Sequence, residues 1–226
     1  MKWNDIGYLI SKTKYNENSL IAEFFTEHHG KCSGIIFGGT SKKIKNYLQV
    51  GNKLNLNYNS KIDNKLGYFN TEIVIAHTPF YFENNKKLTC IVSAMNLIKL
   101  LTVESQENIK IYNLIDHLFL VLKSEEWVKE YIFWELKLLE FVGYNLNLEK
   151  IVQLETIKNK KVYFVKSNTE KKYVPNFLID RKESNLDKAN LSKGLKLVGD
   201  FLEKNVLKPN NISYPVARLE FINLFK

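Results

Sequence analysis

The spacing of apolar residues changes near residue 80, and this change constrains the fold of the chain more than any other feature. Before it, short apolar runs alternate with turn-forming residues at roughly 8–12-residue spacing, which is typical of strands in a small closed sheet. Five such runs begin at Ile6, Ser19, Lys31, Lys53 and Tyr68. Three glycines suit the strand bends that a barrel needs, namely Gly7, Gly34 and Gly67. The first eighty residues are therefore predicted to form a β-barrel.

From residue 81 the apolar residues recur three and four positions apart, which is the spacing of amphipathic helices. These stripes cover residues 88–98, 111–122 and 125–141, and Gly143 stands where a left-handed helix cap is expected. Such stripes are more often core than a cofactor pocket. A further helix is predicted from about residue 187 to 206, and a last one after Ser213 and Pro215.

Residues 151–180 lack this helical spacing. Residues 161–165 are predicted to be a strand, 167–169 a turn and 172–174 a returning strand. The predicted fold is thus α+β and multidomain. It consists of a barrel domain over residues 1–80 and a helical domain over 81–226, with residues 150–182 as a small β insertion.

Composition restricts the class of protein. A hydrophobic fraction of 45% suits packed cores, and the chain contains no apolar run long enough for a transmembrane helix. Its start lacks the apolar stretch of a secretory signal. The two cysteines, Cys32 and Cys90, cannot form a disulfide framework or a four-cysteine zinc site. We expect a cytoplasmic protein that makes no membrane contact.

The formal net charge of +9 indicates a polyanionic partner such as nucleic acid. A Lys-, Asn- and Ile-rich composition is also what an AT-rich genome produces. Only Arg181 and Arg218 are arginines, and lysines suit phosphates better than the bidentate reading of bases. The first eighty residues carry ten lysines and six acidic residues, a net charge of +4, so DNA can contact both parts of the chain.

Motifs for catalysis are missing from the sequence. It contains no nucleophile elbow, phosphate-binding loop, paired metal-ligand helix or dinucleotide fingerprint. Adjacent His28 and His29 point in different directions, so we expect turn residues and no shared metal ion. A nuclease, the enzyme alternative, needs clustered carboxylates to hold its metal, and none is evident. The chain is predicted to be no enzyme and to need no cofactor or metal.

The segment from Gly39 to Asn46 is the strongest candidate site and is predicted to be a loop between two strands. It carries three lysines, with an aromatic residue beside it and another lysine on the preceding strand. These residues are Lys42, Lys43, Lys45, Tyr47 and Lys31. Basic side chains with aromatics over a sheet favour a groove for single-stranded nucleic acid. An ordinary solvated lysine loop is the alternative interpretation.

Six segments follow one another in an order and spacing that resemble a known family. They are WNDIGYLI (3–10) with NENS (16–19), FTEHHGK (25–31), GGTSKK (38–43), LQVG (48–51), WELKLLEFVGY (134–144) and RLEF (218–221). The family is the bacterial recombination mediator and DNA repair protein RecO, and the resemblance spans nearly the whole chain.

The resemblance implies an OB-fold barrel that presents positive charge to DNA, followed by a helical domain. It implies binding of single- and double-stranded DNA and annealing of complementary strands at the nucleoid. It also implies cooperation with RecR to load RecA on gaps coated by single-stranded DNA-binding protein, whose C-terminal tail is bound. By position, Lys31, Lys42, Lys43 and Lys45 are expected DNA contacts. Arg218 is a further candidate, with packing of the chain's tail as its alternative role.

One departure from the family concerns zinc. Many relatives carry a four-cysteine zinc site after the leucine-glycine-tyrosine helix, but here residues 148–150 read LEK and residues 151–180 contain no cysteine. The insertion is therefore expected to be a degenerate zinc-finger-like region without metal. Aromatic packing is expected to replace the ion. The residues expected to do so are Tyr163, Phe164, Tyr173 and Phe177.

Two further hypotheses remain open from the sequence. An apolar groove among the helices, with a lysine at its rim, is expected to accept the acidic tail of single-stranded DNA-binding protein. The alternative function is an OB-fold RNA-binding or ribosome-associated protein.

Overall fold

The structure is a computed structural model that describes residues 1–60, 66–157, 160–166, 171–184 and 186–225. The chain forms two compact units. The first contains residues 1–119 and 215–221, and the second contains residues 120–214 and 222–226. The division into domains over 1–80 and 81–226 differs from these units, because the first unit also includes helical segments, and it stays a proposal.

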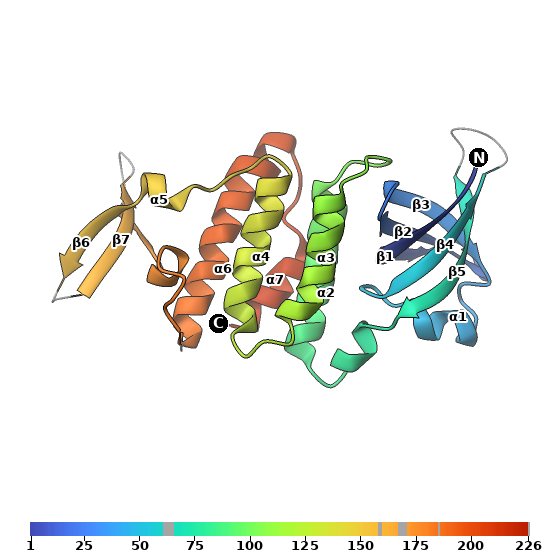
Figure 1. Cartoon of the computed structure of the whole chain (residues 1–226), viewed down its shortest axis with the longest axis horizontal. Helices are drawn as coiled ribbons and strands as arrows, with labels where there is room; N and C mark the ends of the chain where they lie inside the picture. Colours follow the sequence, from blue (N-terminus) through green and yellow to red (C-terminus); the bar gives the residue numbers. More distant parts are fainter. Residues whose placement is uncertain (61–65, 158–159, 167–170, 185, 226) are drawn as a thin grey trace. The chain divides into compact units, whose positions relative to one another are not determined.

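The first unit contains a closed five-stranded barrel with the strand order β1-β2-β3-β5-β4 (Figure 1). The pairing is antiparallel except between β3 and β5, which run parallel where the barrel closes. This ring confirms the predicted OB-fold barrel and the five predicted strands. The strands are β1 (Lys2–Lys14), β2 (Ser19–Thr26), β3 (Gly30–Phe37), β4 (Lys53–Asn59) and β5 (Gly67–Ile75).

Strand β1 is longer than the predicted run because it serves two neighbours. Its first half pairs with β4 and its second half with β2, with a shift of register between Leu9 and Ser11. The backbone of Leu9 turns to the loop before β4: its N–H donates to the Asn52 carbonyl at 3.0 Å and its carbonyl accepts from Gly51 N–H at 2.8 Å. Such an irregularity bends a strand, as barrel closure requires.

Glycines allow the barrel to close. Gly34 and Gly67 are partners in the parallel β3–β5 pairing. A Cβ atom on Gly34 would lie 2.5 Å from the Phe69 ring, and one on Gly67 would lie 2.4 Å from the Tyr58 ring. Aromatic rings thus occupy the space that side chains at these two positions would need. From the sequence alone these glycines are expected only at strand bends, and the structure adds this steric reason for them.

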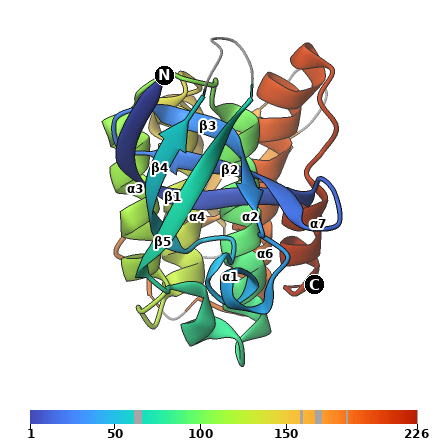
Figure 2. The same cartoon turned by 90° about the vertical axis from the view of Figure 1, so that its right-hand side faces the viewer.

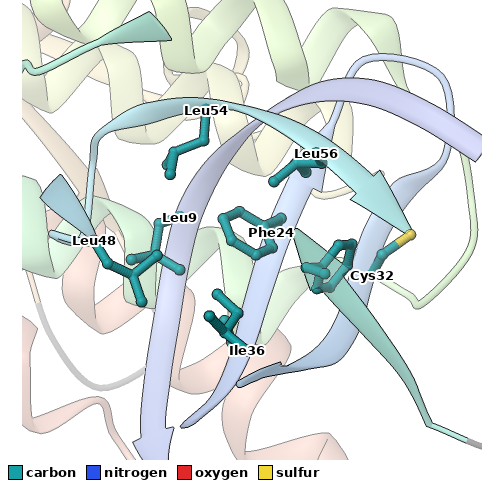
Figure 3. Close-up of a cluster of buried hydrophobic side chains, with 9 residues drawn as sticks. Leu9, Phe24, Cys32, Ile36, Leu48, Leu54 and Leu56 are labelled. Carbon is teal, nitrogen blue, oxygen red and sulfur yellow. The ribbon is translucent and has the colours of Figure 1, made fainter. Parts of the chain in front are cut away.

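The barrel core is apolar and centred on aromatic rings. Phe24 and Phe69 meet edge to face with 5.0 Å between ring centroids. Figure 3 shows Phe24 among aliphatic side chains from several strands. The buried cluster consists of Leu9, Ala22, Phe24, Cys32, Ile36, Leu48, Leu54, Leu56 and Phe69. Truncation of a ring such as Phe24 to alanine costs about 3–5 kcal/mol in a core of this kind.

A short helix, α1 (Lys42–Tyr47), replaces the predicted loop between β3 and β4. The expectation of a loop over residues 39–46 is therefore wrong for most of that segment. The helix begins after Ser41, whose extended backbone precedes it, and Gly38 supplies a left-handed turn at φ 68°. Ile44 and Tyr47 pack against the barrel core, so tertiary contacts stabilise a helix too short to form alone.

The rest of the first unit is helical. A 3₁₀ turn η1 (Thr78–Tyr81) follows β5, and helices α2 (Asn85–Leu101) and α3 (Ile109–Val121) come next. Asn84 caps α2, its side-chain oxygen accepting from Lys87 N–H at 3.1 Å. Within the unit, Tyr8 donates to Asp116 of α3, and Lys53 lies 3.0 Å from the same carboxylate. Burial and this carboxylate raise the pKa of Tyr8.

The second unit is built from helices and a small sheet. Its elements are α4 (Trp127–Phe141), α5 (Leu148–Ile151), β6 (Gln153–Ile157), β7 (Lys160–Lys166), β8 (Lys171–Val174), the 3₁₀ turns η2 (Asn176–Leu178) and η4 (Lys208–Asn210), α6 (Lys188–Leu202) and the π-helical η3 (Glu203–Leu207). Helix α7 (Val216–Asn223) contributes residues to both units. The predicted turn at residues 167–169 lies outside the described residues.

The end of α4 confirms the predicted cap. Gly143 has φ 94°, its N–H donates to the Glu140 carbonyl at 3.0 Å, and Tyr144 N–H donates to the Leu139 carbonyl at 2.7 Å. This pair of bonds is the Schellman motif, which satisfies carbonyls that the last turn leaves free. The Val142-Gly143-Tyr144 segment therefore has a structural role at the end of α4.

Aromatic packing around the insertion agrees only partly with expectation. Phe177 is buried, and α6 approaches its ring closely at Gly194, where a Cβ atom would lie 2.6 Å from it. Phe164 is also buried. Tyr173, however, is 56% exposed, so the expectation that it packs in place of a metal is wrong.

No helix of the described residues is both long and apolar enough to cross a membrane.

Candidate nucleic-acid interface

Helix α1 lies beside the strands at one end of the barrel (Figure 2). It carries Lys42, Lys43 and Lys45, which are all exposed. At 3.6 residues per turn, the three lysines lie within an arc of roughly 160°, and Ile44 points the opposite way. Because Ile44 faces the barrel core, the lysines face outward. We call these three residues the α1 basic surface.

Strand β1 adds a fourth cation that the sequence analysis missed. The Lys12 ammonium donates to the carbonyl of Leu48, the residue that follows α1. Burial lowers the pKa of Lys12, and the nearby charge of Lys45 lowers it further. A bound phosphate would offset this repulsion. No sequence signal links Lys12 to this surface, because 30 or more residues separate it from α1.

The loops beside α1 are fixed by hydrogen bonds. Thr40 donates to the carbonyl of Glu17 at 2.9 Å, which ties the turn between β1 and β2 to the start of α1. On the other side, Tyr47 donates to the Thr71 carbonyl of β5 at 3.0 Å. The α1 basic surface is therefore held on the barrel by contacts with β1, the β1–β2 turn and β5 and by its apolar side.

Lys31 does not join this surface. Its ammonium donates to the carbonyls of Lys99 and Thr102 at 2.9 and 2.6 Å, so it satisfies the C-terminal end of α2. A cation in this position is stabilised by the free carbonyls and the helix dipole. Lys31 therefore stabilises the end of α2, and a contact between its ammonium and DNA would compete with these two hydrogen bonds.

Arg218 has no exposed surface. The guanidinium would have to leave this buried position to reach the phosphates of bound DNA, so a role of Arg218 as a DNA contact stays a proposal that its burial does not support. Its alternative role, packing near the end of the chain, is consistent with this burial.

The His28–His29 turn is organised by a buried carboxylate. Asp5 accepts from Ile6 N–H at 2.8 Å and from His28 N–H at 3.0 Å, and its Oδ2 lies 2.7 Å from His29 Nδ1. The His29 ring stacks on Trp3 with 4.1 Å between centroids. Burial acts to raise the pKa of Asp5, but these hydrogen bonds outweigh it and hold that pKa below its usual value. Both histidines are thus turn residues.

A hollow of about 660 Å³ lies beside this turn, but its charge is wrong for phosphate. Its lining includes the carboxylates of Asp5, Glu27 and Glu72 together with several asparagines. Ligand atoms of Asp5, Glu27 and His28 lie within 4.8 Å of one another, close enough in principle to share a cation. Asp5 already accepts three hydrogen bonds there, so the turn explains its carboxylate without a metal.

The fold and the basic helix define a class: an OB-fold protein in which a closed barrel displays lysines at one end. Residues 1–77 match the family model described as Recombination protein O N terminal, and residues 83–213 match Recombination protein O C terminal. The chain belongs to this family, whose members act in DNA repair and recombination.

Two similar proteins match this chain over nearly its full length and nearly the full length of their own chains. DNA repair protein RecO of Wolbachia pipientis subsp. Culex pipiens is 29% identical over 96% of this chain and 97% of its own. DNA repair protein RecO of Ehrlichia chaffeensis is 27% identical over 99% and 98%. A solved structure, Entamoeba histolytica asparaginyl-tRNA synthetase (AsnRS), has 12% identity and a TM-score of 0.31, which is too low to indicate a shared fold.

Proposed function

We propose that this chain is a recombination mediator that binds DNA through the α1 basic surface and anneals complementary strands. The observation that carries the proposal is the outward arrangement of Lys42, Lys43 and Lys45 on a helix whose other side is locked into the barrel core. The family to which the chain belongs supports a role in repair and recombination.

The proposed mechanism is electrostatic. Lysines neutralise phosphates and release counterions, which gives affinity without reading the sequence of the bases. Because the contacts are to the backbone, the bases stay free to pair. Two strands near one positive surface repel each other less, so annealing is faster. This mechanism makes and breaks no covalent bond and needs no cofactor.

The proposal extends to partners through the family. We propose that the chain acts with RecR to load RecA on gaps coated by single-stranded DNA-binding protein, in the cytoplasm at the nucleoid. Annealing of complementary strands coated with the cognate single-strand binder tests this role. Addition of the chain should speed annealing of coated strands, and an unchanged rate would contradict it.

Binding of the acidic tail of single-stranded DNA-binding protein stays a proposal with little support from the second unit. A hollow there is lined by Val128, Lys129 and Leu191 but also by Glu125 and Glu126. Lys129 is already paired, with Glu126 at 3.1 Å and the Glu183 carbonyl at 2.7 Å. Fluorescence anisotropy with a tail peptide tests the hypothesis, and the absence of saturable binding would remove it.

The α1 basic surface is tested by converting Lys42, Lys43 and Lys45 together to glutamate. Each lost phosphate contact lowers the slope of log affinity against log salt by roughly 0.7–0.9, so the slope should fall by about two to three. Affinity for DNA should fall strongly while the thermal melting curve is preserved, since the core side of α1 is unchanged.

The matched control places the same charge change elsewhere. Lys123, Lys193 and Lys196 are exposed in the second unit and can be converted to glutamate together. This control should lose less affinity than the α1 variant. Equal losses would show a response to net charge alone, and wild-type affinity of the α1 variant would contradict the site.

Competition between DNA and RNA of matched sequence tests the alternative function, an OB-fold RNA-binding or ribosome-associated protein, because preference for RNA would favour it.

A further inference from the structure

Positive charge is concentrated in the insertion of the second unit. Residues 150–182 contain nine lysines or arginines and three acidic residues, a net charge of +6 in a chain whose total is +9. The first eighty residues account for +4, and all the others together for −1. Much of this charge lies on or beside the three-stranded sheet β6–β7–β8, away from α1 in the sequence.

The pairing register places aromatic and basic residues on one face of this sheet. Phe164 is opposite Tyr173, and Lys166 is opposite Lys171. Directly paired residues project to the same side of an antiparallel sheet, and so do residues two apart in a strand. These four side chains therefore share a face, which we call the β7–β8 face.

The other face of the same strands is already used. Val174 is buried, and Lys172 forms an ion pair with Asp200 of α6. Lys172 and Val174 alternate with Lys171 and Tyr173 along β8, so they point to the opposite side. Residues on that side of β8 thus contact α6, whereas Lys166, Lys171 and Tyr173 of the β7–β8 face are exposed beside the buried Phe164.

Tyr173 on the β7–β8 face is more exposed than buried. Its side chain is 56% exposed, and the Lys171 ammonium lies 5.6 Å from its ring centroid. The same ammonium lies 4.0 Å from the centroid of the buried Phe164 ring. Lys171 also pairs with Glu155, but both partners of this ion pair are exposed, so the pair contributes little and a phosphate can compete with it.

We propose that the β7–β8 face binds single-stranded nucleic acid, with a base stacked on Tyr173 and the adjoining phosphates on Lys166 and Lys171. An exposed aromatic ring beside cations is the combination that sequence-tolerant single-strand binding uses. The site shares no residue with the α1 basic surface and lies in the other unit, so either can fail while the other stands. With both, one molecule has two places at which to hold strands.

Tyr173→Ala in the full chain tests the base contact. Loss of one base–aromatic stack should weaken binding of a thymidine oligonucleotide roughly tenfold, because stacking contributes on the order of 1–3 kcal/mol per base. Binding of blunt duplex should be unchanged, since its bases are already stacked within the helix. Tyr173→Phe keeps the ring and should retain wild-type affinity, which a role of the hydroxyl group would not allow.

Lys166→Glu tests the phosphate contact, with Lys123→Glu and Lys193→Glu as charge-matched controls in the same unit. The salt slope for the oligonucleotide should fall by roughly 0.7 for Lys166→Glu. Neither control should change it as much. Thermal melting of each variant shows whether the fold persists, and an oligonucleotide with 5-iodouracil should photo-crosslink to Tyr173.

The outcomes separate the two sites. In a background with Lys42, Lys43 and Lys45 converted to glutamate, adding Tyr173→Ala should weaken the residual oligonucleotide binding by roughly a further tenfold. Wild-type affinity of the single variant Tyr173→Ala, with no crosslink at Tyr173, would overturn the proposal. So would a β7–β8 face that binds anionic phospholipid vesicles but no oligonucleotide.

Discussion

At the scale of single residues, the buried carboxylate of Asp5 has the clearest effect. Its side chain is 1% exposed and accepts hydrogen bonds from two backbone N–H groups and from the ring of His29. These bonds fix the turn that joins β2 to β3, and they stabilise the ionised form. Removal of such an acceptor leaves buried donors without a partner, which costs more than the bond itself contributes.

Asp5→Asn should therefore lower the free energy of unfolding by about 2–3 kcal/mol at pH 7. The pKa of Asp5 is lowered in the folded state, so its stabilisation is present above the unfolded value near 3.8 and is lost as pH falls through the folded value. The difference between wild type and variant should shrink below about pH 4. Thermal melts from pH 2 to 7 measure this.

The control for this prediction is Glu17→Gln, which removes an exposed carboxylate from the turn between β1 and β2. Its melting curve should follow the wild type within about 0.5 kcal/mol at every pH. A constant offset between wild type and Asp5→Asn from pH 2 to 7 would contradict the role assigned to the ionised carboxylate.

At the scale of elements, the β3–β5 junction decides whether the barrel closes. Two glycines face each other there because aromatic rings fill the space beside them. The same principle explains α1: its position between β3 and β4 is set by Ile44 and Tyr47, which pack on the core that the closed barrel creates. Closure of the barrel and presentation of the lysines are therefore linked.

Gly34→Ala should destabilise the first unit by about 1–3 kcal/mol, because the added methyl group would lie 2.5 Å from the ring of buried Phe69. Chemical denaturation measures the change. Ser33→Ala, on the same strand, removes only an exposed hydrogen bond to Glu104 and should cost less than about 0.5 kcal/mol. Equal stability of Gly34→Ala and wild type would mean that Phe69 does not fill the closure point.

At the scale of the whole molecule, stability should not depend on a metal ion. The insertion lacks cysteines, and two of its aromatic side chains, Phe164 and Phe177, are buried. A structural zinc ion contributes folding free energy directly, so its removal would unfold the segment it holds. We therefore expect the melting temperature to be unchanged by prolonged treatment with a chelator.

Calorimetry before and after dialysis against a chelator measures this, with elemental analysis of the purified chain beside it. A lower melting temperature after chelation, restored by zinc, would contradict the prediction.

The charge distribution also belongs to this scale: the barrel and the insertion hold nearly all the net positive charge, so both should contribute to the salt dependence of binding.

The sequence alone determined the elements and their class. Alternation and helical spacing are properties of neighbouring residues, so the five barrel strands, the long helices and the cap at Gly143 were predictable from them, whereas α1, α5 and β6 were not. Family membership could also be recognised from the quoted segments, because their order and spacing along the chain can be compared without knowing the fold. The lysines of α1 were identified in the same way.

Only the tertiary structure decided how residues far apart in the chain are used. It formed α1 by packing Ile44 on the core, assigned Lys31 to the end of α2, buried Arg218 and left Tyr173 exposed. None of these outcomes follows from local spacing, because burial and pairing depend on contacts between segments distant in sequence. The physical reason is that a helix or strand is specified by nearby residues, whereas the exposure of a side chain is set by whatever packs against it.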